Sequence, residues 1–244
     1  MKVYNLTTEK CASRSVGGAI EVILGDKYLK TYPEKHSKIF PKFIQSYYHL
    51  TTDDWNNFDK LCDDNYVFQF VRNPFDRFVS SFIMAYGGDE GHNFIADDIP
   101  KLRNPISKEN QLLCFKDFCK RVSDSFNGGN FNMNSHVMLQ TDCLSFTART
   151  PKHNIMEFDI CDYIERKKYN IFKVENYDES LETLTSDFEK NNFVTFKFLK
   201  NIGKIGDRSS KKFSTDYRDW YNDETYNLMS PHFKKEMELF NYEF

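Results

Sequence analysis

Apolar side chains in this chain fall into short continuous runs and longer periodic stretches, the pattern of strands that alternate with helices. Residues 1–6 alternate apolar and polar side chains and predict a short strand, and residues 14–25 predict a helix after it. The aromatic and β-branched run YVFQFV at 66–71 predicts a buried strand. Pro74 ends that run, and the apolar period that follows predicts a helix with this proline in its first turn.

The rest of the chain continues this alternation. Residues 51–62 carry Thr and Asp at the front, which predicts a capped amphipathic helix. Its apolar stripe is Trp55, Phe58, Leu61 and Cys62. The run YNIFKV at 169–174 predicts a second buried strand. Further helices are predicted at 107–123, 178–191 and 216–240, and irregular insertions that are candidates for substrate contact at about 87–106 and 124–134.

Strands that feed helices through short turns predict an α/β fold with a mostly parallel central sheet flanked by helices. The 244 residues show no internal repeat and no linker, so we expect a single domain over residues 1–244. The composition is 40% hydrophobic and includes 24 Phe and 14 Tyr, which is enough for a large buried core.

The charge balance narrows the choice of partners. The formal net charge is −3 and the pI is about 6.1. Proteins that grip a nucleic acid through many phosphates usually have a basic surplus, so no nucleic-acid partner is expected. Any anion that this chain binds must be held by a local cluster of donors.

The cysteine pattern and the hydropathy of the chain bear on its location. Six cysteines occur without CxxC pairs, and no histidine lies at zinc-finger spacing, so we expect reduced, mostly buried thiols and no metal site. The first ten residues contain no apolar signal core, and no stretch reaches the ~18 apolar residues of a membrane span. The expectation is a cytoplasmic protein without a membrane span.

The segment EKCASRSVGG at residues 9–18 lies between the first predicted strand and the helix after it. Its small residues allow backbone N–H groups to converge, and the start of a helix adds a positive dipole that favours a bound anion. Lys10 adds a full charge, and Ser13, Arg14 and Ser15 add short-range donors. The Walker A pattern GxxxxGK[ST] is absent. Taken alone, the segment fits an anion cradle and an ordinary strand–helix turn with a solvated lysine about equally well.

The segment FQFVRNPFDRFVSSF at residues 68–82 puts Arg72 where a strand feeds a helix and Ser80 about two turns along that helix. Together the two segments resemble the donor-binding signatures of the sulfotransferases. They are closest to the carbohydrate-type branch (sulfotransferase family 2-like), which uses 3′-phosphoadenosine-5′-phosphosulfate (PAPS). In that family a PK-x-x-x-T-S loop grips the 5′-phosphosulfate, and FVR-[ND]-P-x-x-R-x-x-S holds the 3′-phosphate. Lys10 and Ser15 match the loop, and Arg72 and Ser80 match the second motif.

The resemblance covers almost the whole chain in the family's order. SHVMLQTDCL at 135–144 is similar to the family's H-x-x-x-Q-x-D stretch, and IFKVENYDESLETL at 171–184 is similar to a later one. The ending from Tyr217 onward resembles the family's C-terminal pattern. Two positions differ, since Glu9 stands where the family loop has Pro and Arg14 where it has Thr. Arg14 can supply a further bidentate phosphate donor.

The resemblance implies a P-loop-like fold and in-line transfer of a sulfuryl group from PAPS to a hydroxyl acceptor, on a carbohydrate or a small molecule, without a metal. It gives Lys10 a catalytic role, because this charge neutralises the phosphate that leaves. The basic loop near residue 208 fits a lid over the 3′-phosphate and also a solvated loop. The residues that the resemblance assigns to the donor are Lys10, Cys11, Ala12, Ser13, Arg14, Ser15, Arg72, Ser80, Arg208, Lys211 and Lys212.

The transfer also needs a base for the acceptor's hydroxyl proton, and histidine is the commonest choice near neutral pH. His49, in SYYHLTTDDW, resembles the histidine of a K-H-x-T-x-x-E stretch that serves as the base in related proteins. The alternative is a histidine that caps a local turn. His136 is the second candidate for the base; the alternative for it is a structural role, in which it hydrogen-bonds one element to another. His92 is a candidate for substrate contact.

Two other functions fit parts of the pattern. A nucleotide-dependent phosphotransferase or kinase would need Mg²⁺ and normally a Gly-Lys-Ser/Thr loop, which the chain lacks. A non-catalytic nucleotide-binding module of the same fold would be consistent with Glu9 and Arg14 in the anion loop.

Overall fold

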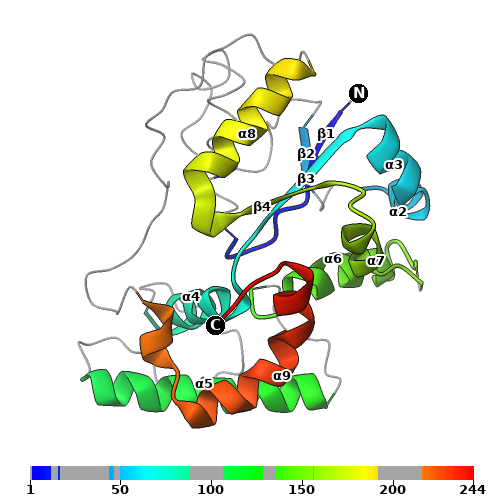
Figure 1. Cartoon of the computed structure of the whole chain (residues 1–244). Helices are drawn as coiled ribbons and strands as arrows, with labels where there is room; N and C mark the ends of the chain where they lie inside the picture. The colour runs from blue at the N-terminus through cyan, green and yellow to red at the C-terminus, as the bar shows by residue number, and fades with distance from the viewer. Residues whose placement is uncertain are drawn as a thin grey trace. The chain divides into compact units, whose positions relative to one another are not determined.

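A computed structural model describes residues 2–11, 16, 44–46, 50–87, 107–128, 136–155, 157–191 and 216–244, with the backbone alone at 44–46 and 85–87 (Figure 1). These residues belong to two compact units. Unit 1 comprises Met1–Arg72 and Leu144–Asp207, and unit 2 comprises Asn73–Cys143 and Arg208–Phe244. The single domain expected from the sequence stays a prediction. The helix predicted at 14–25 lies outside the described residues, apart from the buried Val16.

Unit 1 contains a four-stranded parallel sheet (Figure 1). Val3 of the first strand lies opposite Ile44 and Tyr66 of its two neighbours. The prediction of an α/β fold with a parallel sheet is confirmed. The strands are β1 (Val3–Asn5), β2 (Ile44–Ser46), β3 (Tyr66–Val71) and β4 (Asn170–Lys173), in the order β2-β1-β3-β4.

β4 differs from the buried strand that the run at 169–174 predicts. It pairs with β3 on one side and is the last strand of the described sheet on the other. Within the strand only Phe172 is buried, and Asn170 is exposed. The prediction of a strand is confirmed, but within β4 the predicted burial holds for Phe172 alone, since β4 has a neighbour on only one side among the described strands.

Alternate residues of a strand point to opposite faces of the sheet. Tyr66, Phe68 and Phe70 of β3 lie on one face, which α8 (Tyr177–Lys190) covers. A short 3-10 turn, η3 (Val174–Asn176), joins β4 to this helix. The helix forms and packs here because its apolar residues recur at helical spacing, at Tyr177, Leu181, Leu184 and Phe188.

The other face of the sheet carries Gln69 and an aromatic layer from α2 (Thr52–Asn56), α3 (Phe58–Asp64) and α7 (Ile160–Glu165). Tyr169 joins this layer to the sheet, since its hydroxyl donates to Gln69 Oε1 at 3.0 Å and its ring centroid lies 6.3 Å from that of Phe58. The remaining rings of the layer are Trp55, Phe158 and Tyr163.

The predicted helix at 51–62 is two helices with the predicted cap. The Thr51 side chain accepts from the Asp54 N–H at 3.2 Å, and the Asp54 carboxylate accepts from the Thr51 N–H at 2.8 Å. Asn57 then leaves the helical conformation, with φ −117° and ψ 38°, and α3 begins at Phe58. The predicted apolar stripe is nevertheless buried throughout.

Unit 2 is built from α4 (Pro74–Gly87), α5 (Lys108–Asn127), η4 (Tyr217–Trp220) and α9 (Asp223–Leu239) (Figure 1). Its core is largely aromatic, with Phe75, Phe82 and Phe233 among the buried rings. The helices predicted after Pro74 and at 107–123 are confirmed. The stretch predicted as one helix at 216–240 is instead the 3-10 turn η4 followed by α9, because the backbone at Tyr221 and Asn222 is extended. α5 continues to Asn127, so the first residues of the predicted irregular segment at 124–134 are helical.

A further helix, α6 (Gln140–Arg149), begins in unit 2 and ends in unit 1. The buried carboxylate of Glu236 in α9 caps its first turn. This carboxylate accepts from the Thr141 N–H at 2.7 Å and from Gln140 Nε2 at 3.1 Å. A negative charge is stabilised at a helix N-terminus, so Gln140 of the recognised H-x-x-x-Q-x-D stretch contributes to a capped helix start.

Burial shapes the chemistry of the cysteines. Five of the six are buried, and Cys114 is partly exposed. Burial raises the pKa of Cys62 to about 12, and it also raises the pKa of Cys119. These two thiols are therefore protonated at neutral pH. No helix in the described ranges is long and apolar enough to cross a membrane.

Candidate functional site

The candidate site begins where β1 leaves the sheet. The Leu6 N–H still donates to the Phe68 carbonyl at 2.8 Å, as a continuing strand would. At the next step the Phe70 N–H donates to the Thr7 hydroxyl instead, at 2.9 Å, and both groups are buried. The Thr7 N–H donates to Asn5 Oδ1 at 3.0 Å. Thr7 thus keeps the ladder satisfied with its side chain while its backbone turns away from β3.

The backbone then makes a tight turn, and we call residues 7–11 the edge turn. The Cys11 N–H donates to the Thr8 carbonyl at 3.4 Å, and the side chains of the same two residues meet at 3.6 Å between Oγ1 and Sγ. Both residues are fully buried. Between them, Lys10 has φ 65°, in the left-handed region that residues with a Cβ rarely adopt.

Arg72 meets the edge turn from the neighbouring strand. It follows the last residue of β3, and β3 runs parallel to β1, so both segments leave the sheet at its carboxyl edge. Arg72 Nη1 donates to the Lys10 carbonyl oxygen at 3.3 Å. Both residues are partly exposed. The structure therefore brings together two residues that lie 62 positions apart and that sequence motifs single out independently.

Two further predicted site residues belong to unit 2. Ser80 lies on α4 and is partly exposed. His136 lies before α6, and the next residue of α4, Ser81, donates its hydroxyl to the His136 carbonyl. The buried Arg77 of α4 donates from Nη1 to the Met138 carbonyl. The segment with His136 is thus tied to α4 through its backbone, and the roles of Ser80 and His136 stay predictions.

The other predicted site residues lie outside the described residues. They are Ala12, Ser13, Arg14, Ser15, His49, His92, Arg208, Lys211 and Lys212.

One histidine that sequence reasoning passed over lies beside the start of α2. His153 is 6% exposed, and its Nδ1 lies 3.1 Å from the Thr52 hydroxyl. Burial, with a smaller effect of the Lys152 charge, lowers the pKa of His153. No sequence signal could have found this contact, because the two residues are 101 positions apart and belong to no shared motif.

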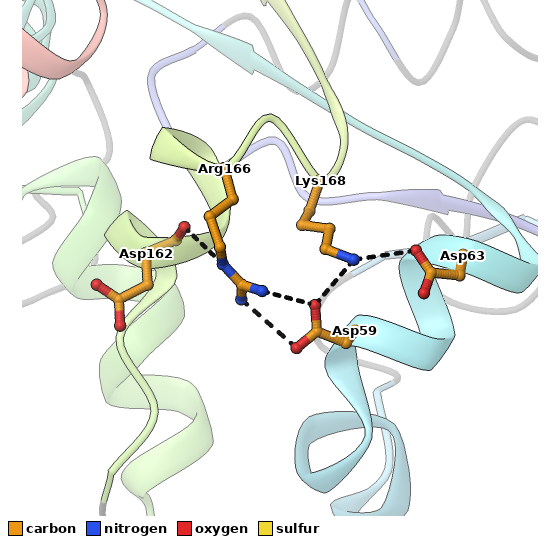
Figure 2. Close-up of polar contacts among 5 residues, drawn as sticks. All are labelled: Asp59, Asp63, Asp162, Arg166 and Lys168. Carbon is orange, nitrogen blue, oxygen red and sulfur yellow. Dashed lines mark hydrogen bonds and ion pairs between the residues drawn. The ribbon is translucent and has the colours of Figure 1, made fainter.

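A second polar cluster of unit 1 lies on its surface, and we call it the surface network (Figure 2). Asp59 accepts from Arg166 Nη1 at 3.0 Å and from Lys168 Nζ at 3.1 Å, and Lys168 also reaches Asp63 at 3.2 Å. The pKa of the Asp59 carboxyl is lowered, mainly by the hydrogen bond from Lys168 and also by Arg166. The residues of the surface network are Asp59 and Asp63 of α3, and Arg166 and Lys168 between α7 and β4.

The two clusters have different chemistry. In the surface network each cation meets a carboxylate, so the cluster neutralises itself and joins α3 to the segment before β4. At the edge turn a guanidinium meets a backbone carbonyl at the carboxyl edge of a parallel sheet, where proteins of this architecture bind their ligands. Among the residues that the structure describes, no group of three His, Cys, Asp or Glu side chains could hold a metal ion.

The fold and this edge define an α/β protein with two cationic residues from neighbouring segments at the ligand-binding end of its sheet. The family model described as the Sulfotransferase family matches residues 2–243, so the chain belongs to the sulfotransferase family. It is accordingly an enzyme that transfers a sulfuryl group to an acceptor. Comparisons with curated proteins and with solved structures found no match.

Proposed function

We propose that this sulfotransferase takes its sulfuryl group from PAPS and transfers it in line to a hydroxyl group of a carbohydrate. The observation that carries the donor assignment is the contact between Arg72 and Lys10 at the carboxyl edge of the sheet. PAPS has anionic groups at both the 3′ and the 5′ position of one ribose. Because Arg72 donates to the backbone carbonyl of Lys10, both residues lie at the same edge of the sheet, and we propose that one such molecule binds to both.

In this proposal Lys10 lies near the oxygen that bridges phosphate and sulfur, and its charge stabilises the phosphate that leaves. The 5′ end is bound by the backbone N–H groups of residues 12–15 and by the side chains of Ser13, Arg14 and Ser15, while the Cys11 N–H closes the edge turn on the Thr8 carbonyl. Arg72 and Ser80 bind the 3′-phosphate, and the loop with Arg208, Lys211 and Lys212 covers it. The resemblance to the family's donor motifs supports these roles.

The proposed base is His49, which takes the proton of the acceptor hydroxyl as sulfur is attacked. His136 is the second candidate for this role, and His92 is a candidate for contact with the acceptor. The carbohydrate acceptor rests on the resemblance to the carbohydrate-type branch. A cytoplasmic location likewise stays a prediction.

A thermal-shift experiment tests the donor. We expect 3′-phosphoadenosine 5′-phosphate, the product nucleotide, to raise Tm, because a ligand that binds only the folded state stabilises it. ATP with Mg²⁺ is the comparison, since a kinase would prefer it. A larger shift with ATP and Mg²⁺ would contradict the proposal. Transfer of labelled sulfuryl from PAPS to a panel of oligosaccharides and small alcohols then identifies the acceptor.

A pair of histidine variants tests the base. We expect His49→Ala to abolish turnover and to leave the binding of 3′-phosphoadenosine 5′-phosphate intact, because a base acts on the acceptor rather than on the nucleotide. His136→Ala is the matched comparison. If His136→Ala shows this behaviour and His49→Ala keeps turnover, the base is His136. Loss of nucleotide binding in His49→Ala would indicate a structural role for His49.

A further inference from the structure

The conformation of Lys10 needs support from its surroundings. A residue with a Cβ is disfavoured at φ 65°, and it stays there when neighbouring contacts hold it. Lysine has no short polar side chain that could hydrogen-bond locally to favour this conformation, as Asn or Asp has. The support must therefore come from contacts made by other residues.

Two described contacts hold the backbone around Lys10. On one side the Cys11 N–H and the Thr8 carbonyl close the turn, and the two buried side chains meet beneath it. On the other side Arg72 Nη1 holds the Lys10 carbonyl itself. The turn contacts are local in sequence, whereas the Arg72 contact fixes Lys10 relative to the sheet.

Arg72 is well placed to act as such an anchor. The residue before it, Val71, is fully buried and pairs with Lys173 of β4. β3 also pairs with β1, where Phe68 lies opposite Asn5. The sheet therefore fixes both the strand end before the edge turn and the strand end before Arg72. An arginine side chain that starts from a fixed strand end can hold a carbonyl of the neighbouring segment in one place.

We infer that Arg72 is a positioning residue for Lys10, in addition to the contact with the 3′-phosphate that the proposed function gives it; the inference rests on that proposed function. A guanidinium carries five N–H donors in a rigid planar fork, so one edge can hold the Lys10 carbonyl while another binds a phosphate. Removal of Arg72 then has two separable consequences. The donor loses a 3′-phosphate partner, and Lys10 loses the contact that fixes its backbone.

A donor without a 3′-phosphate separates these two consequences. Adenosine 5′-phosphosulfate has the same sulfuryl group and 5′-phosphate as PAPS but no 3′-phosphate for Arg72 to bind. If Arg72 acts on the 3′-phosphate alone, Arg72→Gln does not change kcat with this donor. If Arg72 also positions Lys10, we expect Arg72→Gln to lower kcat with this donor at least about tenfold, since misplacement by about 1 Å can cost a hundredfold.

A double-mutant cycle tests whether the effect passes through Lys10. We expect Arg72→Gln to have no further effect on adenosine 5′-phosphosulfate in the Lys10→Ala background, because residues that act as one unit are not additive. Calorimetric Kd values for the same nucleotide complete the cycle if turnover is too slow to measure. In that case Arg72→Gln is expected to weaken binding at least about fivefold in the wild-type background and not in Lys10→Ala. Equal kcat and equal Kd in wild type and Arg72→Gln, or additive effects in the cycle, would overturn the inference.

Two control variants guard against a general loss of structure. Arg149→Gln removes an arginine of unit 1 that also donates to a backbone carbonyl, that of Phe158 at 2.8 Å, and it should leave both donors unaffected. Arg72→Lys keeps a cation for the 3′-phosphate but loses the fork, so it should retain more PAPS binding than Arg72→Gln while kcat with adenosine 5′-phosphosulfate stays low. Wild-type protein that neither binds PAPS nor transfers its sulfuryl group would refute the proposed function. Normal wild-type behaviour with an unaffected Arg72→Gln refutes only the positioning role.

Discussion

The edge turn and the surface network are both polar clusters of unit 1, yet they differ in what surrounds their charges. The surface network is exposed, and its cations and carboxylates meet each other across α3 and the segment before β4 (Figure 2). In the edge turn, Lys10 has a left-handed backbone conformation and lies between Thr8 and Cys11, which are fully buried. Arg72 donates a hydrogen bond to the carbonyl of Lys10.

This difference shows that the density of charge alone does not identify a functional site. A surface cluster whose charges neutralise one another helps to hold two secondary-structure elements together, and solvent weakens the attraction between its charges. A lysine held in an unfavourable backbone conformation at the carboxyl edge of a sheet is typical of a ligand-binding or active site. Matched substitutions in the two clusters should therefore affect different properties.

The largest expected difference is between two lysines. Lys10→Ala should lower turnover at least about a hundredfold with the fold intact, because loss of one group that stabilises developing charge costs on the order of 3–4 kcal/mol of barrier. Lys168→Ala, the same substitution in the surface network, should leave turnover unchanged. Steady-state transfer of labelled sulfuryl measures both, with circular dichroism as the check on folding. Near-normal turnover in Lys10→Ala would remove Lys10 from the mechanism.

Next in size is the effect of Thr7→Val on stability. Valine has nearly the shape of threonine but no hydroxyl, so the buried N–H of Phe70 would lose its acceptor. A buried donor without a partner costs about 1–3 kcal/mol, which urea denaturation can measure. Thr183→Val is the control, because its hydroxyl donates to the Glu179 carbonyl on the exposed side of α8. Equal losses in the two variants would show that Thr7 does not hold the ladder at the edge turn.

Local patterns predicted much of the fold. The aromatic run of β3, Pro74 at the start of α4 and the apolar stripe of residues 51–62 are features of short stretches, and short stretches determine strands and helices. Lys10 and Arg72 stood out because each lies in a motif at the end of a predicted strand. Their assignment to one edge follows from a parallel sheet, since the carboxyl ends of neighbouring strands meet there.

The remaining features depend on contacts between distant residues. No glycine or asparagine marks Lys10 as left-handed, so its conformation was not visible in the sequence. The contact between Arg166 and Asp59 spans 107 positions and has no local signature. The break at Asn57 and the place of β4 as the last strand of the described sheet likewise depend on how elements pack, and the periodicity of one segment does not reveal this.

The next prediction concerns the contact of His153 with Thr52, whose effect on stability should be smaller than that of Thr7→Val and larger than that of a change in the surface network. The pKa of His153 is lowered in the folded protein, so below the ordinary value of about 6.5 the unfolded chain takes up this proton first. Stability should therefore fall as the pH drops below about 6.5, and Tm measured from pH 8 to pH 5 should show it. His153→Gln should make this decline shallower. His232→Gln is the comparison in unit 2, because burial also lowers the pKa of that histidine. An unchanged slope in His153→Gln would show that the pKa of His153 is not lowered in the folded protein.

The smallest expected effect is that of Asp59→Asn in the surface network. The lowered pKa of Asp59 means that its contribution to stability is present above the ordinary carboxyl value of about 3.9 and is lost as the pH falls through the folded-state pKa. Because these charges are exposed, the expected decrease in Tm at pH 7 and low salt is only about 1–3 °C. In 1 M salt the Debye length shrinks to about 3 Å, so the difference from wild type should nearly vanish. Asp64→Asn is the matched control, since Asp64 pairs with Lys60 along α3 and joins no second element in the part of the chain that the structure describes. A decrease in Tm that persists in 1 M salt would mean that the network stabilises the fold through packing. Any loss of turnover would mean that the network affects the candidate site. Either result would contradict the contrast between the surface network and the edge turn.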